Sequence, residues 1–163
     1  MKKKKIIILR EQTKNDARIS YKWRNDNKVW NKTIGGGKFT KDKHINIKDE
    51  IIWFNKVKKN KRRKNLSILV DANKLIGYIY FTDIEKSKAQ FHIVIGNKLF
   101  WNKGYGYRAT ILSLYFAKIN YNLKNFYLYV RKDNIPAKKI YKKIGFKVSN
   151  VYKNDILKME YKL

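Results

Sequence analysis

Residues 100–110 read FWNKGYGYRAT, with two glycines placed among aromatic and basic side chains. The preceding run AQFHIVIG, at 89–96, is rich in β-branched and aromatic residues and is typical of a strand. From Tyr105 to about Asn120, apolar residues recur at helical spacing. The glycines therefore lie in a loop that leads from a strand into a helix.

Gly104 and Gly106 lack side chains where the main-chain amides of the predicted helix N-terminus are free, so an anion can approach closely. No acidic residue occurs from 87 to 132. These features predict a phosphate-binding loop, and the alternative is that the glycines serve only a tight turn. Positive charge comes from Lys98, Lys103 and Arg108.

Residues 104–109 also match the dinucleotide-binding fingerprint G-x-G-x-x-A. The context does not fit, because residues 97–103 separate the strand from Gly104 where the fingerprint needs a tight turn. No acidic residue follows at the spacing needed to bind a ribose hydroxyl, although Arg131 could serve a 2′-phosphate. Only one βαβ unit is available, so a nicotinamide enzyme is disfavoured.

The rest of the chain predicts one α/β domain, 1–163, with a mixed, mostly antiparallel central sheet flanked by about four helices. The short connections within 66–96 favour antiparallel hairpins, and Ile6–Leu9 is expected at an edge of the sheet. IGGGKF, at 34–39, reads as a flexible loop. Strands are expected at 4–11, 66–71, 75–83, 89–96, 125–130, 146–152 and 156–163, and helices at 13–26, 47–57, 105–120 and 133–145.

The helix at 105–120 is expected to be largely buried. Its predicted buried stripe consists of Leu112, Tyr115, Phe116 and Ile119, widened by Ala109, Ile111 and Leu114.

The formal net charge of +28, from 40 Lys and Arg against 12 Asp and Glu, invites interpretation as nucleic-acid binding. Lysines are spread along the chain, and Lys, Asn and Ile are abundant throughout. An AT-rich genome produces this composition at surface positions that tolerate substitution. We therefore read the charge as mainly compositional and nucleic acid as an unfavoured partner. Such a field still attracts anions and disfavours polycations.

The chain contains no cysteine, which excludes disulfides, thiol nucleophiles and cysteine-ligated metals, and we predict no metal site. The apolar run Ile6–Leu9 is too short for a signal peptide, and no stretch reaches transmembrane length. We expect a soluble, cytoplasmic protein with no membrane partner.

The loop FWNKGYGYRA resembles motif A of the GNAT acetyltransferases, in which Q/R-x-x-G-x-G/A binds the pyrophosphate of coenzyme A. NIPAKKIYKKIGF, at 134–146, is similar to their motif B. Trp101 occupies the usual Gln/Arg position, as in the branch whose loop reads W-x-K-G-Y, and Arg108 stands where that branch often carries Glu. The resemblance spans nearly the whole chain and implies the GNAT fold with acetyl-CoA as co-substrate. It implies coenzyme contacts from Asn102, Lys103, Gly104, Tyr105, Gly106, Tyr107, Arg108, Asn134 and Ala137.

The resemblance also implies direct transfer of an acetyl group from the thioester to a primary amine. Main-chain amides around Val94 and Ile95 would hold the thioester carbonyl and stabilise the developing oxyanion. The motif B tyrosine, Tyr141, would protonate the departing thiolate, since a phenol of pKa about 10 can protonate a thiolate whose thiol has a pKa of about 8.5. Packing is the alternative role of Tyr141.

Three candidates remain for the base that deprotonates the amine. Family members often place a carboxylate on this strand, but Gln90 takes that site here and cannot accept a proton. His92 lies on the same face as Gln90 and would titrate near neutral pH, with a purely structural role as its alternative. Asp83, at the end of the preceding strand, is the second candidate, and a chain of waters is the third.

WRND, at 23–26, and IKDEIIWF, at 47–54, resemble the N-terminal helices of GNAT enzymes that acetylate nucleotide-linked amino sugars. Ile51 replaces the histidine of that branch, and core packing is the alternative role of the aromatic residues. Implied acceptor contacts come from Trp23, Arg24, Asn25 and Glu50.

A diphosphate-bearing sugar suits the net charge, whereas a polyamine would need an acidic pocket. Ribosomal-protein N-termini are a third acceptor, because that branch shares the same loop. A basic, non-enzymatic nucleic-acid-binding protein is the alternative of another class. We expect the enzyme to act as a monomer or a homodimer on a small-molecule amine.

Overall fold

The structure is a computed structural model that describes residues 5–31, 33 and 44–163, so the predicted loop IGGGKF lies outside the described residues. None of the helices in these ranges is long and apolar enough to cross a membrane. The elements are β1 (Ile7–Glu11), α1 (Lys14–Arg24), α2 (Asn27–Trp30), α4 (Ile47–Lys58), β2 (Lys64–Val70), β3 (Lys74–Glu85), β4 (Lys88–Ile95), the 3-10 helix η1 (Lys98–Phe100), α5 (Tyr105–Tyr121), β5 (Asn125–Arg131), α6 (Ile135–Ile144), β6 (Lys147–Lys153) and β7 (Ile156–Lys162).

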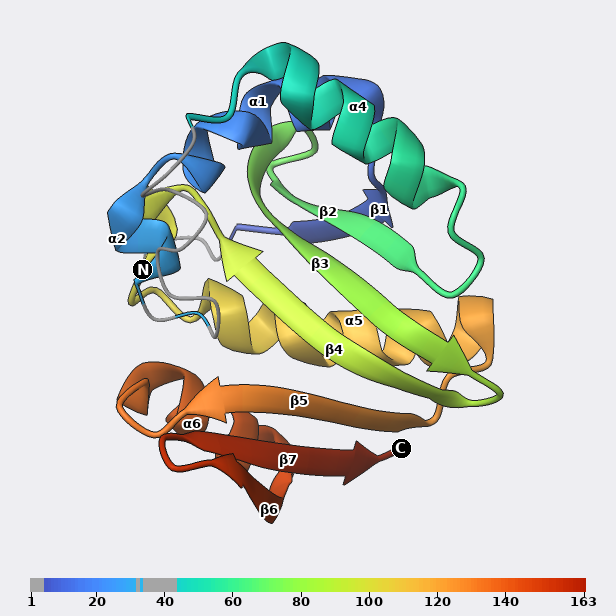
Figure 1. The fold of residues 1–163 in the computed structure, drawn as a ribbon, viewed down its shortest axis with the longest axis vertical. Helices are drawn as coiled ribbons and strands as arrows, with labels where there is room; N and C mark the ends of the chain where they lie inside the picture. Colours follow the sequence, from blue (N-terminus) through green and yellow to red (C-terminus); the bar gives the residue numbers. More distant parts are fainter. Residues whose placement is uncertain (1–4, 32, 34–43) are drawn as a thin grey trace.

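The seven strands form one sheet in the order β1-β2-β3-β4-β5-β7-β6, as Figure 1 shows. Every neighbouring pair is antiparallel except β4 and β5, which are parallel. The predicted mixed, mostly antiparallel sheet is therefore confirmed, and the N-terminal strand lies at an edge as expected. The described residues form five α-helices, one more than the four predicted, because α2 is a separate short helix.

Local signals start and end the helices. Thr13 and Asp16 form a capping box at α1, with Asp16 N donating to Thr13 Oγ1 and Thr13 N donating to the Asp16 carboxylate. Asn46 and Asp49 form a second box at α4. Gly145 ends α6 with a left-handed φ of +115°, a conformation that glycine adopts without steric cost.

Helices cover both faces of the sheet. On one face, Phe81, Phe91 and Phe126 from adjacent strands form the main core, which α5 and α6 cover. On the other face lie α1, α2 and α4, where Ser67 Oγ of β2 donates a hydrogen bond of 2.9 Å to Asp16 Oδ2 of α1. Each face of the sheet therefore carries an apolar layer that is buried under its own group of helices.

The predicted buried stripe of α5 is confirmed only at Ala109 and Leu114, and its centre is wrong. Leu112, Tyr115 and Ile119 are 40%, 50% and 80% exposed. Small hydroxyl side chains fit the crowded face because they donate to main-chain carbonyls of the preceding turn, as Thr110 does to Gly106 O at 2.8 Å. Besides the predicted Ala109 and Leu114, the buried face consists of Tyr105, Thr110, Ser113 and Ala117.

The parallel pair β4 and β5 is hydrogen-bonded over a short length only. Residues 88–90 pair with 125–127, and beyond them the two strands diverge (Figure 1). Main-chain groups of residues 91–95 on this edge therefore have no partner strand among the residues that the structure describes. An open strand edge inside a sheet is a place where a ligand can bind to the main chain.

Gly96 follows β4 at a point where Trp23 lies against the main chain. A Cβ at Gly96 would stand 2.0 Å from Cδ2 of Trp23, whose ring is also held by stacking on Tyr78 at 6.1 Å between centroids. We expect Gly96→Ala to lower the free energy of unfolding by about 1–3 kcal/mol, because the indole must move out of a packed site. Urea denaturation measures this loss. Adding Trp23→Leu should restore part of it, and a Gly96→Ala protein of wild-type stability would contradict the packing.

Candidate active site

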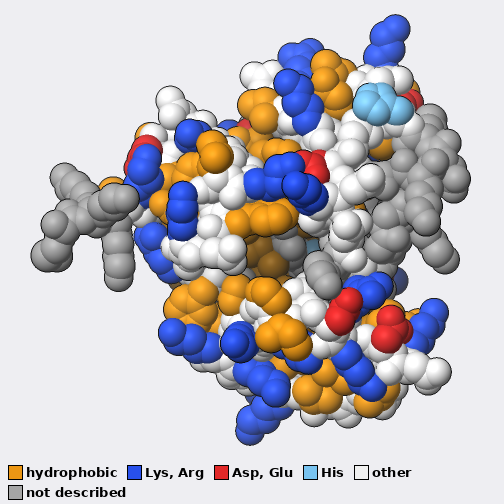
Figure 2. All heavy atoms as spheres, turned by 90° about the vertical axis from the view of Figure 1, so that its left-hand side faces the viewer, with side chains coloured by type: hydrophobic (Ala, Val, Ile, Leu, Met, Phe, Trp, Pro, Cys, Tyr) orange, Lys and Arg blue, Asp and Glu red, His pale blue; other side chains and the backbone are white. Residues whose placement is uncertain are grey.

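A cleft of about 620 Å³ opens where β4 and β5 diverge. Its walls come from β4, β5, α6 and the first turns of α5, and α2 with Tyr80 of β3 closes one end. Figure 2 faces this side and shows hydrophobic side chains deep in a central hollow, with Lys and Arg side chains and some Asp and Glu side chains around it. The volume suits a small-molecule site, for which about 300–1,000 Å³ is usual. No Asp or Glu is found among the described residues that line it.

The glycine loop leads from β4 through η1 into the N-terminus of α5. Asn102 and Gly104 both adopt left-handed φ angles, of +56° and +78°. Gly104 is the N-cap of α5, where no side chain caps the helix, and a Cβ added there would meet nothing within 4 Å. The first amides of α5 thus lack a side-chain partner on an open side, the arrangement that binds phosphate at helix N-termini. Gly106 lines the cleft itself.

Three side chains of this loop contact the protein itself. Lys103 Nζ donates to a main-chain carbonyl of η1 at 2.7 Å. The ring of Tyr105 packs edge-on against Phe100, 5.1 Å between centroids, and the ammonium of Lys143 lies 4.8 Å from the ring of Tyr107. The predicted coenzyme contacts of this loop are therefore best made by main-chain amides.

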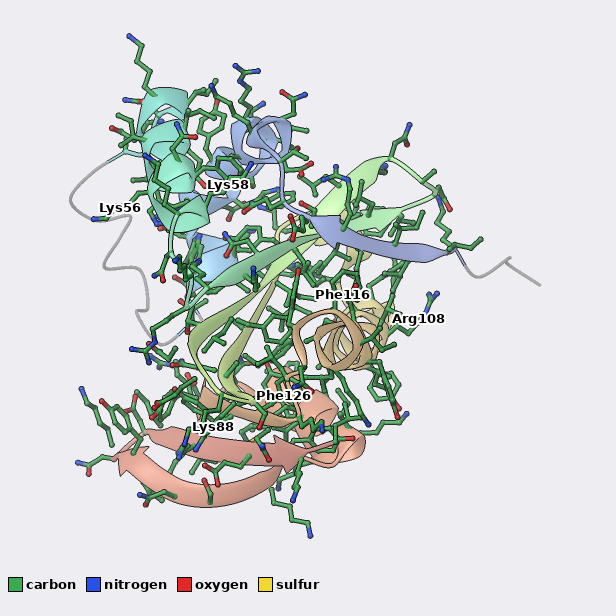
Figure 3. All side chains as sticks on the ribbon, turned by 90° about the vertical axis from the view of Figure 1, so that its right-hand side faces the viewer. Lys56, Lys58, Lys88, Arg108, Phe116 and Phe126 are labelled. Carbon is green, nitrogen blue, oxygen red and sulfur yellow. The ribbon has the colours of Figure 1, made fainter. Side chains whose placement is uncertain are left out.

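Arg108 is bound to other parts of the chain. Its main-chain amide donates to Gly104 O at 3.1 Å, within α5, and its Nη2 donates to Lys5 O at 2.7 Å. Figure 3 shows its side chain pointing outward from α5. The geometry therefore gives no support to a coenzyme contact through the Arg108 amide.

Trp101 fastens the glycine loop to the open edge of β4. Its Nε1 donates to Ile95 O at 2.7 Å, and the ring lines the cleft. Since the main-chain groups of a strand alternate between its two edges, the amide of Ile95 points to the same open edge as its carbonyl. The amide of Val94 then points toward β3, so Ile95 suits the predicted thioester contact better than Val94.

Tyr141 enters the cleft from α6. Its ring packs edge-on against Phe91, with 6.4 Å between the ring centroids. It packs at a tilt against Phe146, with 5.7 Å between the centroids. Burial, and next the nearby Tyr80, raise the pKa of the Tyr141 phenol, so it stays protonated at neutral pH. No hydrogen bond joins the phenol to any residue in the described ranges. A protonated donor that is not already committed can give its proton to a leaving group, and that role stays a prediction.

Asn134 and Ala137 lie beside Tyr141 on the cleft wall. Asn134 is the N-cap of α6, and its Oδ1 accepts a hydrogen bond of 3.3 Å from Ala137 N. This cap fixes the first turn of the helix and with it the position of Tyr141. Their contact with the coenzyme stays a prediction.

His92 lines the cleft from β4, as its alternation with Gln90 indicates. Its ring stacks on Tyr80 at 4.5 Å, and Nε2 lies 2.9 Å from Thr82 Oγ1. Burial, and next the positive charge of Arg63, lower the pKa of His92 to about 4. The expectation that His92 titrates near neutral pH is therefore wrong. Its imidazole is neutral at physiological pH and a weak base.

Asp83 is exposed to solvent, where β3 departs from regular pairing with β4. It has a left-handed φ of +51°, and its Oδ2 accepts a hydrogen bond of 3.4 Å from Thr82 Oγ1. Asp83 does not line the cleft, so a direct contact with the amine has no support in this geometry. Thr82, which no sequence motif indicates, lies between the two candidate bases.

The four predicted acceptor residues brace the helices rather than line the described part of the cleft. Trp23 packs on the main chain after β4, and Arg24 Nη1 donates to Glu50 Oε2 at 3.1 Å, joining α1 to α4. Burial raises the pKa of Glu50, while the charge of Arg24 opposes this. Asn25 exchanges two hydrogen bonds with the main chain of Ile45, at 2.7 and 2.9 Å. These four residues therefore stabilise the helices that lie behind the cleft wall.

The end of the cleft near α2 contains residues that the sequence did not reveal. Trp30 of α2 and Tyr80 line it, and the Arg63 guanidinium lies 4.5 Å from the ring of Tyr80. Arg63 and Arg24 also lie 5.1 and 4.9 Å from the ring of Trp53. In the sequence, Arg63 is one of several basic residues in the loop 58–64. Only the fold shows that it lies behind the cleft wall.

Comparisons with known proteins agree with this geometry. Residues 7–147 match the domain family described as acetyltransferase (GNAT) domain. An N-acetyltransferase of Bacillus subtilis, YnaD, described as uncharacterized, is 30% identical over 157 residues, which cover 94% of this chain and 86% of the relative.

Solved structures share the fold at low identity. A domain from Methanocaldococcus jannaschii aligns with a TM-score of 0.79 at 20% identity, covering 98% of this chain and all of the other. A spermidine N-acetyltransferase from Vibrio cholerae, in complex with CoA and spermine, aligns with a TM-score of 0.79 at 19% identity, covering 96% of this chain and 95% of that one. At these identities the likeness shows the fold.

Proposed function

The chain belongs to the GNAT acetyltransferase family, and from this premise we propose that it acetylates the primary amine of a small anionic acceptor, such as a nucleotide-linked amino sugar. As a GNAT N-acetyltransferase, the chain uses acetyl-CoA as co-substrate. The proposal concerns the acceptor and the residues that carry the chemistry. A ribosomal-protein N-terminus and a polyamine are the other acceptors to be tested.

The proposed reaction is a direct transfer within the cleft. The free amine attacks the thioester carbon, the carbonyl oxygen takes negative charge near the amide of Ile95, and the C–S bond then breaks as the amide forms. Tyr141 gives its proton to the departing thiolate. The amides of Asn102–Tyr107 hold the pyrophosphate, which places the thioester beside β4. No cysteine is available for an acyl-enzyme, consistent with a single transfer step.

The acceptor class rests on the charges at the cleft. No described lining residue is acidic, so a polyamine would bury its ammonium groups without a counter-ion. Behind the wall near α2, Arg24 pairs with Glu50, and the Arg63 guanidinium lies against the rings of Trp53 and Tyr80 with no ion pair to any described carboxylate. The excess guanidinium charge favours an anionic group there. Trp30 and Tyr80 offer ring surface for a base or a sugar.

We expect an amine panel, assayed by thiol release from acetyl-CoA, to rank a UDP-linked amino sugar with a free amine above spermidine by at least about tenfold in kcat/KM, because the protein field attracts anions. A peptide with a free N-terminus completes the panel. The kcat/KM for the anionic amine should fall as salt is raised, since salt screens the attraction.

Arg63→Gln is expected to weaken the preference for the anionic amine, and Lys61→Gln, on the exposed part of the same loop, serves as the matched control. Spermidine as the best acceptor would contradict the proposal and favour the polyamine alternative. Thermal stabilisation by RNA with a steep salt dependence, without stabilisation by acetyl-CoA, would favour a nucleic-acid-binding protein.

A further inference from the structure

We propose that Thr82 relays a proton between His92 and Asp83, so that the proton released by the acceptor amine leaves the cleft along β3 and β4 to solvent. This inference rests on the proposed acetyl transfer, because it supplies the step that removes the amine proton. It makes Thr82 a positioning residue and joins two separate base candidates into one path.

The inner half of the path is a short hydrogen bond across neighbouring strands. Thr82 of β3 pairs in register with Gln90 of β4, next to His92, and the Thr82 hydroxyl lies 2.9 Å from Nε2 of His92. Stacking on Tyr80 fixes the plane of the imidazole. Nδ1 of His92 makes no hydrogen bond to the part of the chain that the structure describes, and the residue lines the cleft. Nδ1 is thus the nitrogen available to the acceptor.

The outer half of the path depends on a bulge. Pairing between β3 and β4 shifts register between Thr82 and Glu85, and Asp83 in this bulge takes a left-handed φ of +51°. Regular alternation would send successive side chains to opposite faces, whereas here the Asp83 carboxylate accepts from Thr82 Oγ1 at 3.4 Å. This distance exceeds the range of about 2.5–3.0 Å that is usual for an O–H···O bond, and catalytic hydrogen bonds are often long before substrate binds. Backbone strain of this kind is often found at functional sites.

A relay solves the difficulty that His92 poses as a simple base. Burial and the charge of Arg63 disfavour the imidazolium, with a pKa of about 4, so His92 cannot store a proton at neutral pH. A concerted relay never needs the imidazolium, because one nitrogen receives a proton while the other gives one up. The exposed Asp83 then passes the proton to water.

Every proton and bond in the step is accounted for. As the C–N bond forms, the amine N–H proton passes to Nδ1 of His92, the Nε2 proton passes to Thr82 Oγ1, and the Thr82 hydroxyl proton passes to the Asp83 carboxylate. The electron pair of the broken C–S bond stays on sulfur, which takes a proton from Tyr141, and the Tyr141 phenolate regains a proton from water. The imidazole regains its starting tautomer by exchange with water after the product leaves.

Thr82→Val tests the relay, because valine has nearly the same shape and suits a strand but has no hydroxyl. We expect kcat to fall at least about tenfold with an unchanged KM for the acceptor. Thr82→Ser keeps the hydroxyl and should stay within about twofold of wild type. Asp83→Asn keeps a side chain that tolerates left-handed φ and removes the carboxylate, and should match the loss of Thr82→Val.

The assay uses the best acceptor of the amine panel. A Thr82→Val enzyme with wild-type kcat would overturn the relay. So would a Thr82→Ser enzyme as slow as Thr82→Val, because the hydroxyl would then not be what matters.

A spectroscopic readout separates this inference from the proposed function. The relay requires the Nε2–H tautomer of His92, which long-range ¹H–¹⁵N spectra of the histidine rings report directly. The sequence has two histidines, so the exposed His44 serves as the internal reference. We expect Nε2–H in the wild type and a shift toward Nδ1–H in Thr82→Val. Wild-type protein in the Nδ1–H form would overturn the relay even if every amine is acetylated, whereas failure of every amine with the Nε2–H form intact would count against the proposed function alone.

Discussion

Replacing Tyr141 with phenylalanine is expected to lower kcat by about 100-fold or more while the affinity for acetyl-CoA stays within about twofold, because a general acid acts in the transition state and not in the bound ground state. The Tyr141 ring packs against Phe91 and Phe146, and the raised pKa of its phenol keeps the proton in place at neutral pH. Without that proton, sulfur must leave as a thiolate in an apolar cleft, where an unpaired anion is poorly solvated.

Tyr129→Phe is the matched control, because Tyr129 also lines the cleft from β5 and the change removes the same atom. The ring of Tyr129 packs on Tyr152 at 4.7 Å, so the fold should persist. Turnover is measured by thiol release at saturating acetyl-CoA, and affinity by calorimetry. Equal turnover of Tyr141→Phe and wild type would remove Tyr141 from the proposed role and leave it a packing residue.

Replacing Gly104 with valine is expected to weaken coenzyme A binding by about tenfold or more, because a β-branched residue is strained at positive φ and the loop must change its path. The open space around Gly104 shows that a collision of the new side chain with the protein is not the cause. The loss would come from displaced amides at the start of α5, which no longer point together at the pyrophosphate.

Gly104→Asn provides the control, since asparagine tolerates left-handed φ and should retain most of the affinity. Calorimetric titration with coenzyme A gives the dissociation constant of each variant. Unchanged affinity in Gly104→Val would undo the assignment of this loop to the pyrophosphate.

Local signals in the sequence predicted most of the architecture. The capping box of Thr13 and Asp16, the left-handed Gly145 and the short hairpin connections each depend on neighbours a few residues away. The glycine loop was recognised for the same reason, since φ angles and free amides at a helix start are local properties. The comparisons confirm the family that these motifs indicated.

The buried face of α5 could not be predicted in the same way. Apolar spacing selected Leu112, Tyr115 and Ile119, yet these side chains are exposed, and Thr110 and Ser113 are buried. The helix packs closely on β1 and β4, so small side chains fit where large ones do not, and main-chain carbonyls satisfy the buried hydroxyls. Periodicity measures hydrophobicity and says nothing of the distance to the next layer.

By itself, the sequence determined where the strands, turns and helix starts lie, because short-range sterics and hydrogen bonds set these features, and it predicted an anion-binding loop before α5. Only the tertiary structure decided which side chains share the cleft. It placed Arg63 behind Tyr80, set Thr82 between His92 and Asp83, and lowered the pKa of His92 by burial. Burial and distance between residues far apart in the chain exist only once the sheet has formed, and proton affinities depend on both.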